Sequence, residues 1–185
     1  MVSEGLAQAL FCQLVGHIVC GGLSFCMAFY QLLKTLPIPS EMDTIWNFIS
    51  RPENLKLITP RQMGFEIVTP ELPETMYPGM IIEYRVSPIQ GFRQRWVTEI
   101  SYIREGQYFV DEQRVGPYAL WHHEHFIEPI KGGVLMKDIV SYKMPFGPIG
   151  ILAHTLFVRR KLEAIFEYRK EAMESRFGTY SPPMD

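Results

Sequence analysis

The chain has 185 residues, a length that suits one domain with a sizeable core better than two small ones. Its 18 Lys and Arg side chains nearly balance 20 Asp and Glu side chains, so the strong positive charge of nucleic-acid-binding domains is missing. We therefore expect no nucleic acid partner. Aromatic residues are spread along the chain without a period, which argues against a solenoid or a propeller.

Residues 1–26 form an apolar extension of a different kind from the rest. No Asp, Glu, Lys or Arg lies between Glu4 and Lys34, and this stretch is long enough to cross a bilayer. If it is a membrane segment, Lys34 and the later basic residues favour a cytoplasmic position for the main domain. The other interpretation, which we favour, is a dispensable extension or a mis-assigned start, with Met27 as the real first residue.

The three cysteines, Cys12, Cys20 and Cys26, all belong to this extension. Their odd number and their position indicate no disulfide framework and no zinc knuckle in the main body of the chain. A reducing compartment fits best, so we expect a cytoplasmic protein, with membrane association through residues 1–26 as the alternative.

The elements that follow are one strand, two short helices and a run of strands. The alternating pattern of 29–36 predicts a strand that Pro37 and Pro39 end, and apolar spacing predicts short helices around 40–49 and 51–58. From Phe65 onward the period changes to two, and turn signals separate most of the strand candidates, which favours an antiparallel meander. The predicted strands are 64–68, 80–86, 94–102, 107–114, 120–128 and 134–142.

A long amphipathic helix is predicted after Pro148, followed by a short tail over 176–185. Its apolar positions recur every three to four residues and are Ile151, Val158, Leu162, Ile165 or Phe166, and Met173. Helices do not alternate with strands, so the fold class is α+β and not doubly wound. We predict a seven-stranded antiparallel sheet curved around the C-terminal helix.

Seven segments carry a resemblance to known proteins: "WNFISRPENLKLITP", "GFEI", "PGMIIEYRV", "RWVTEI", "FVDEQRVGPYALWHHEH", "MKDIVSYKMPFGPIG" and "LEAIFEYRK". Together with the order of the elements they resemble the SRPBCC superfamily, the START-like or helix-grip group that includes polyketide cyclases and lipid carriers. The resemblance is most specific at "FVDEQRVGPYALWHHEH", covers roughly residues 27–175 and leaves the first 26 without a counterpart. It implies a ligand-binding domain.

Alternation within each strand predicts which side chains face the interior. Charged residues mark the outer face, and the sets assigned to the inner face are Ile82, Tyr84 and Val86; Trp96, Thr98, Ile100 and Tyr102; Phe109, Asp111 and Gln113; Trp121, His123 and His125; and Val134, Met136, Asp138, Val140 and Tyr142. Two carboxyl groups and two imidazoles are thus predicted among apolar neighbours.

Turns near Gly116 and Lys131 predict the pairing of these polar residues. Like faces meet when Asp111 lies opposite His123 and Gln113 opposite Trp121, and when Asp138 lies opposite His123 or His125. Three interpretations of the resulting cluster stay open: a structural network, a polar end for a bound hydrophobic ligand, and proton transfer by His123 oriented by Asp138 or Asp111.

The second interpretation is the function that we expect: binding of a small hydrophobic or amphipathic molecule, such as a lipid, quinone, isoprenoid or polyketide-like compound, between the sheet and the C-terminal helix. The residues predicted to contact it are Tyr84, Trp96, Thr98, Phe109, Asp111, Gln113, Trp121, His123, His125, Asp138, Tyr142, Val158 and Leu162. The alternative is a cyclase or dehydratase, a lyase or isomerase, that uses His123, Asp111 and Asp138.

A metal site is considered and set aside. His123 and His125 are spaced as in cupins, with Glu128 or Asp138 as a third ligand, but the glycine and glutamate pattern of cupins is missing and Glu128 falls on the other face. We expect no metal and no cofactor. His154 is interpreted as a surface or cavity-edge residue, and the basic residues 159–161 as a solvated helix face.

Overall fold

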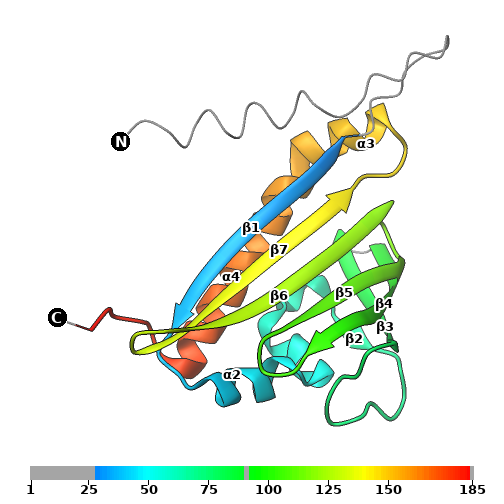
Figure 1. Cartoon of the computed structure of the whole chain (residues 1–185). Coiled ribbons are helices and arrows are strands. Elements are labelled where there is room, and N and C mark those ends of the chain that lie inside the picture. The colour runs from blue at the N-terminus through cyan, green and yellow to red at the C-terminus, as the bar shows by residue number, and fades with distance from the viewer. Residues whose placement is uncertain (1–27, 90–91, 184–185) are drawn as a thin grey trace, which may run out of the picture.

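The computed structural model describes residues 28–89 and 92–183, which form one seven-stranded antiparallel sheet packed against a long helix (Figure 1). The strand order is β1-β7-β6-β5-β4-β3-β2. The strands are β1 (Phe29–Ile38), β2 (Glu66–Ile67), β3 (Met80–Ile89), β4 (Phe92–Arg104), β5 (Tyr108–Val115), β6 (Leu120–Ile130) and β7 (Gly133–Lys143). The predicted α+β class and the antiparallel meander are confirmed.

Short helices fill the segment between β1 and β2, at the lower end of the sheet in Figure 1. They are α2 (Met42–Ile49) and the 3₁₀ helices η2 (Pro52–Ile58) and η3 (Arg61–Met63). Pro52 begins η2, where a missing N–H costs nothing because the first helical N–H groups have no partner within the helix. Ile45, Trp46 and Phe48 of α2 are buried.

The C-terminal helix lies along the concave face of the sheet and continues to Phe177 in three parts (Figure 1). It begins as α3 (Pro148–Ala153), passes through a π segment, η4 (His154–Val158), and ends as α4 (Arg159–Phe177). Leu162, Phe166 and Met173 are its buried residues in α4. This arrangement confirms the predicted curved sheet around one long helix.

Strand pairing brings the predicted polar residues together at the centre of the sheet. Asp111 of β5 lies opposite His123 of β6, as predicted, and of the two positions considered for Asp138 the structure has the one opposite His125. A two-residue turn at Lys131 and Gly132, with Gly132 at φ +80°, fixes the β6–β7 register.

Gln113 does not pair with Trp121, contrary to the prediction. The β5–β6 pairing ends at Glu112 and His122. Beyond that point the Gln113 amide binds the backbone of Tyr118 twice, donating to its carbonyl oxygen at 2.8 Å and accepting from its N–H at 3.2 Å. The side chain therefore fastens the loop between the two strands.

Tyr102 is the one residue of the inner-face sets that points outward. The β4–β5 register shifts between Ile100 and Tyr102, which reverses the alternation beyond that point. Tyr102 is 49% exposed and stacks on Tyr108, while Ile103 packs against the core in its place.

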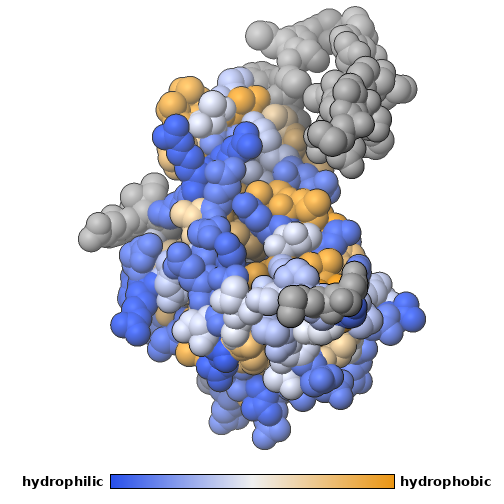
Figure 2. Space-filling model, turned by 90° about the vertical axis from the view of Figure 1, so that its left-hand side faces the viewer, coloured by the Kyte–Doolittle hydropathy of each residue, from blue (hydrophilic) through white to orange (hydrophobic). Residues whose placement is uncertain are grey.

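An exposed apolar surface lies at the end of the molecule where the C-terminal helix begins (Figure 2). Phe146, Ile149, Leu152 and Leu156 are each at least 60% exposed. None of the helices within 28–89 and 92–183 is long and apolar enough to cross a membrane. The interpretations of residues 1–26 concern a segment outside the described residues, and the domain boundaries stay predictions.

Candidate functional site

A cavity of about 750 Å³ lies between the sheet and the C-terminal helix. Its walls are mainly apolar and aromatic because the inner faces of β3 to β6 and the inner side of the helix meet there. Trp96 and Trp121 meet edge to face at 5.3 Å between ring centroids. The Trp96 indole N–H donates to the Thr98 hydroxyl at 3.0 Å and is therefore not free to bind a ligand.

The cavity gathers most of the residues predicted to contact a ligand. Those that line it are Tyr84, Trp96, Thr98, Phe109, Asp111, Trp121, His123, His125, Val158 and Leu162. Three predicted residues do not line it. Gln113 binds the Tyr118 backbone, Asp138 lies behind the two imidazoles, and the hydroxyl of the buried Tyr142 is hydrogen-bonded to His154.

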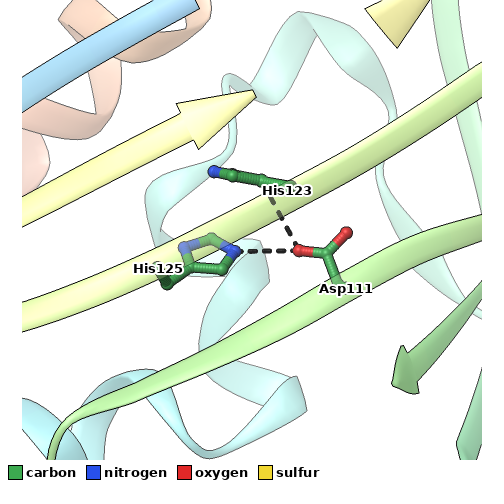
Figure 3. A group of neighbouring side chains, drawn as sticks. All are labelled: Asp111, His123 and His125. Atoms are coloured by element: carbon green, nitrogen blue, oxygen red, sulfur yellow. Dashed lines mark hydrogen bonds and ion pairs between the residues drawn. The ribbon is translucent and has the colours of Figure 1, made fainter. Parts of the chain in front are cut away.

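Two imidazoles and two carboxylates form a closed ring of contacts at the inner end of the cavity. In Figure 3 the Asp111 carboxylate points from β5 toward both imidazoles of β6. Asp111 Oδ2 lies 2.8 Å from His125 Nε2 and 3.5 Å from His123 Nδ1. On the other side, Asp138 Oδ1 lies 3.0 Å from His123 Nε2 and 2.8 Å from His125 Nδ1.

Ring packing holds these imidazoles in place. His125 stacks on Phe109 at 4.2 Å between centroids, and His123 meets the edges of Trp121 and Phe166 at 6.0 and 5.8 Å. The two imidazoles themselves are 3.7 Å apart. Because His123 and His125 stand two residues apart on one strand, they share a face of the sheet, and the neighbouring rings leave them little room to turn.

Arg169 of α4 completes the cluster and was missed by the sequence analysis. Its Nη1 donates to Asp138 Oδ1 at 3.2 Å, and its guanidinium lies over the Phe166 ring at 5.0 Å. The side chain is only 12% exposed. Position 169 continues the apolar spacing of the helix, three residues after Phe166 and four before Met173, and this spacing is the signal that could have identified it.

Burial and charge act against each other on each member of the cluster. Burial, and then repulsion from His125, lowers the pKa of His123 to about 4. Burial also opposes a charge on His125, but hydrogen bonds to Asp111 and Asp138 outweigh it and raise the pKa of His125. His123 is therefore neutral at neutral pH, whereas His125 takes up a proton more readily than an ordinary imidazole does.

Both carboxyl groups stay ionised in spite of their burial. Burial alone would raise the pKa of Asp138, but Arg169 and then the two imidazoles hold it well below its usual range. The His125 hydrogen bond likewise outweighs burial and lowers the pKa of Asp111. The negative charges of Asp111 and Asp138 are thus stabilised by the Arg169 guanidinium and by hydrogen bonds from the imidazoles, as a buried ionic cluster requires.

Several polar groups on the cavity wall have hydrogen-bonding capacity left for a ligand. Burial raises the pKa of Tyr84 and of Tyr118, so both hydroxyls keep their protons. Gln94 Oε1 and Arg169 Nε are buried without a hydrogen-bond partner, and both residues line the cavity. Gln94 is a second residue that the sequence analysis missed, although strand alternation places it on the same face as Trp96 and Thr98.

His154 is buried, contrary to its interpretation as a surface or cavity-edge residue. It stacks on Tyr30 of β1 at 3.5 Å between centroids, and its Nε2 lies 2.8 Å from the Tyr142 hydroxyl of β7. None of His154, Tyr30 and Tyr142 lines the cavity. His154 therefore fastens the start of the helix to the sheet.

Only one group of three or more His, Cys, Asp and Glu side chains in the described part of the chain is close enough to hold a metal ion. It consists of Asp111, His123 and His125, whose ligand atoms lie within 4.8 Å of one another. Neither residue considered as a third ligand from the sequence takes this place. Glu128 is exposed, and Asp138 lies on the far side of the two rings.

Solved structures identify the fold. A START superfamily protein from Mycobacterium smegmatis superimposes with a TM-score of 0.58 at 17% identity, over 80% of this chain and 96% of that one. The chain has the SRPBCC, START-like helix-grip fold. A major latex-like protein from Panax ginseng has a TM-score of 0.57 at 11% identity, over 80% of this chain and 97% of that one.

The same helix-grip fold is found in an enzyme. A norcoclaurine synthase point mutant from Thalictrum, solved with a transition-state analogue, has a TM-score of 0.57 at 14% identity, over 81% of this chain and 97% of that one. No protein-family model and no curated protein sequence matches the chain. At these identities the likeness establishes the helix-grip architecture and not the activity.

Proposed function

We propose that this protein binds a small hydrophobic or amphipathic molecule in the cavity between the sheet and the C-terminal helix. The observation that carries the proposal is the cavity itself, about 750 Å³ of space lined mostly by apolar and aromatic side chains. Such a volume lies within the range of about 300–1,000 Å³ typical of small-molecule sites. A core without a ligand role would be packed with few voids larger than a water molecule.

The ligand that fits this cavity has a long apolar body and one polar end. The apolar body lies against the two tryptophans and the helix, and the polar end meets His123, Asp111 and the free Arg169 Nε. Lipids, quinones, isoprenoids and polyketide-like compounds all have this form. Mass spectrometry of the molecule that copurifies with the intact protein distinguishes among them.

A pair of neighbouring substitutions in β3 tests the proposal. Ile82 is 1% exposed and lines the cavity, whereas Ile81 is 49% exposed and faces away from it. Ile82→Phe fills part of the cavity, so we expect it to weaken binding of the fluorophore 1-anilinonaphthalene-8-sulfonate by about tenfold or more, the equivalent of the 1–3 kcal/mol typical of overpacking. Ile81→Phe should bind as the wild type does.

Thermal unfolding of both variants shows that each is folded before its binding is compared. Equal affinity of Ile82→Phe, Ile81→Phe and the wild type for the fluorophore would mean that the cavity is not the binding site. If Ile82→Phe does not unfold cooperatively, Leu162→Met, which changes the shape of the wall at nearly constant volume, takes its place.

A cyclase or dehydratase is the second candidate, because His123 and Asp111 both face the cavity. The identity of the copurified molecule decides between the two. A binding protein and its His123→Gln variant retain the same molecule, whereas an enzyme retains product and the variant retains the unreacted substrate.

A further inference from the structure

Three acceptor atoms converge at the inner end of the cavity. Asp138 accepts from both imidazoles through one oxygen, at 3.0 Å from His123 Nε2 and 2.8 Å from His125 Nδ1. A carboxylate only accepts hydrogen bonds, so these contacts place a proton on the Asp138-facing nitrogen of each ring. When both rings are neutral, the other nitrogens, His123 Nδ1 and His125 Nε2, turn their lone pairs toward Asp111 Oδ2.

Lone pairs that meet in this way repel unless a positive charge lies among them. Asp111 Oδ2 is 2.8 Å from His125 Nε2 and 3.5 Å from His123 Nδ1. A proton on His125 satisfies the first contact and leaves His123 Nδ1 without a donor. A cation at the centre satisfies all three atoms at once, and bonds of 2.0–2.2 Å in tetrahedral geometry separate such ligand atoms by roughly 3.3 Å.

We propose that Asp111 Oδ2, His123 Nδ1 and His125 Nε2 bind a divalent transition metal ion, with Asp138 holding the far nitrogen of both imidazoles. Two imidazoles and one carboxylate form a ligand set that Zn²⁺ and Fe²⁺ accept with open positions. A carboxylate on the far nitrogen of a metal-binding histidine orients the ring and increases its basicity. Here one carboxylate does so for two rings.

The open coordination positions would face the cavity. All three ligand residues line the cavity, whereas Asp138 does not. An oxygen of a bound molecule could therefore complete the coordination. The metal site goes beyond the proposed binding function, and the two proposals can be tested separately. Ile82→Phe changes the cavity but none of the three metal ligands.

Zinc uptake by the full chain tests the site. After treatment with EDTA and desalting, we expect the wild type to take up one equivalent of Zn²⁺, and Co²⁺ in its place to give the visible absorption of a four- or five-coordinate site. Asp111→Asn and His123→Gln should lose this equivalent. Asp138→Asn keeps the three ligands but not their orientation, so its affinity for Zn²⁺ should fall about 10- to 100-fold.

His122→Gln is the matched control. His122 lies between the two ligand histidines but on the outer face, where its Nδ1 is 2.9 Å from Glu112. It should take up zinc as the wild type does, and the three cysteines near the N-terminus are common to all variants. The proposal is overturned if the wild type takes up no more Zn²⁺ than Asp111→Asn, or if His122→Gln loses as much as His123→Gln. The Zn²⁺ titration of the wild type tests the proposal even if one of the variants does not fold.

Discussion

Asp138 is a carboxylate that stays charged in the interior because three donors share its Oδ1 atom. His123, His125 and Arg169 all reach this oxygen, at 2.8 to 3.2 Å. Only Arg169 among them carries a permanent charge, since an imidazole can lose its proton and a guanidinium does not. The guanidinium is therefore the partner whose loss leaves Asp138 without a permanent countercharge.

We expect Arg169→Met to lower the free energy of unfolding by about 3–5 kcal/mol, the usual cost of removing one partner from a buried ion pair. Arg159→Met is the control, since Arg159 lies on the same helix, is exposed and pairs with Glu163 at 3.1 Å. It should cost no more than about 1 kcal/mol. Denaturant unfolding measures both, and equal losses would show that Asp138 does not depend on Arg169.

The inner-face residues of the cluster could be predicted because nothing interrupts the alternation in β5, β6 or β7 between them. Asp111, His123 and Asp138 each belong to an apolar set, and short turns fix the pairing. Arg169 was missed because a charged residue on an amphipathic helix is normally taken as solvent-facing. Its position in the apolar spacing of the helix indicated burial, but its carboxylate partner is distant in the sequence and could not be assigned.

At the scale of elements, the π segment explains how the C-terminal helix keeps one side on the sheet. His154, Val158, Leu162 and Phe166 are buried and follow one another in steps of four. An α-helix has 3.6 residues per turn, so such steps drift around its axis. The wider turn at His154–Val158 takes up part of the drift.

His154 should make stability depend on pH. Its burial, and then the nearby Arg159, lowers its pKa below the unfolded value of about 6.5, and the other side chains that face it are the rings of Tyr30 and Tyr142. The unfolded chain then binds the proton more readily than the folded chain. The stabilisation is complete above about pH 6.5 and is lost as the pH falls through the lower pKa of the folded state.

His154→Phe keeps a ring against Tyr30 but has no proton to take up. Between about pH 7.5 and pH 5, its unfolding midpoint in denaturant should fall less than that of the wild type. His122→Phe, at an imidazole on the outer face, serves as the comparison. A wild type and a His154→Phe variant that lose the same stability over this range would rule out His154 as the source.

The β-bulge in β4 is a feature of the elements that could not be predicted from the sequence. The alternation of 94–102 extends to Tyr102 without a break in the residue pattern, yet the register shift after Ile100 turns that side chain outward. A bulge places two residues of one strand opposite one residue of its partner, and the alternation within β4 alone does not show where this happens. The order and type of the main elements and the pairing around the polar cluster could be predicted, and the local irregularities that shape the cavity could not.

For the whole molecule, the sheet order sets which contacts join distant parts of the chain. β3 to β7 pair with their neighbours in sequence, whereas β1 pairs only with β7. Closing a long loop costs more entropy than closing a hairpin. We therefore expect the β3–β7 meander to form in the folding transition state and β1 to join it afterwards.

Val140 and Leu32 test this order because they lie directly opposite each other in the β1–β7 ladder. Val140 also pairs with His123 of β6, so it belongs to the meander as well. Val140→Ala should slow folding, with a φ-value above about 0.5, whereas Leu32→Ala should mainly speed unfolding, with a φ-value below about 0.3. Stopped-flow kinetics measures both, and similar φ-values would contradict the order.

The position of β1 at the far edge of the sheet also matters during synthesis. As the polypeptide leaves the ribosome, β1 (Phe29–Ile38) emerges before the other strands. It has no strand to pair with until β7 (Gly133–Lys143) follows. The helix that encloses the cavity is translated later still. For most of its translation the nascent chain therefore exposes the apolar inner face of the sheet and the unpaired strand β1. A chaperone could bind these surfaces until the helix is made.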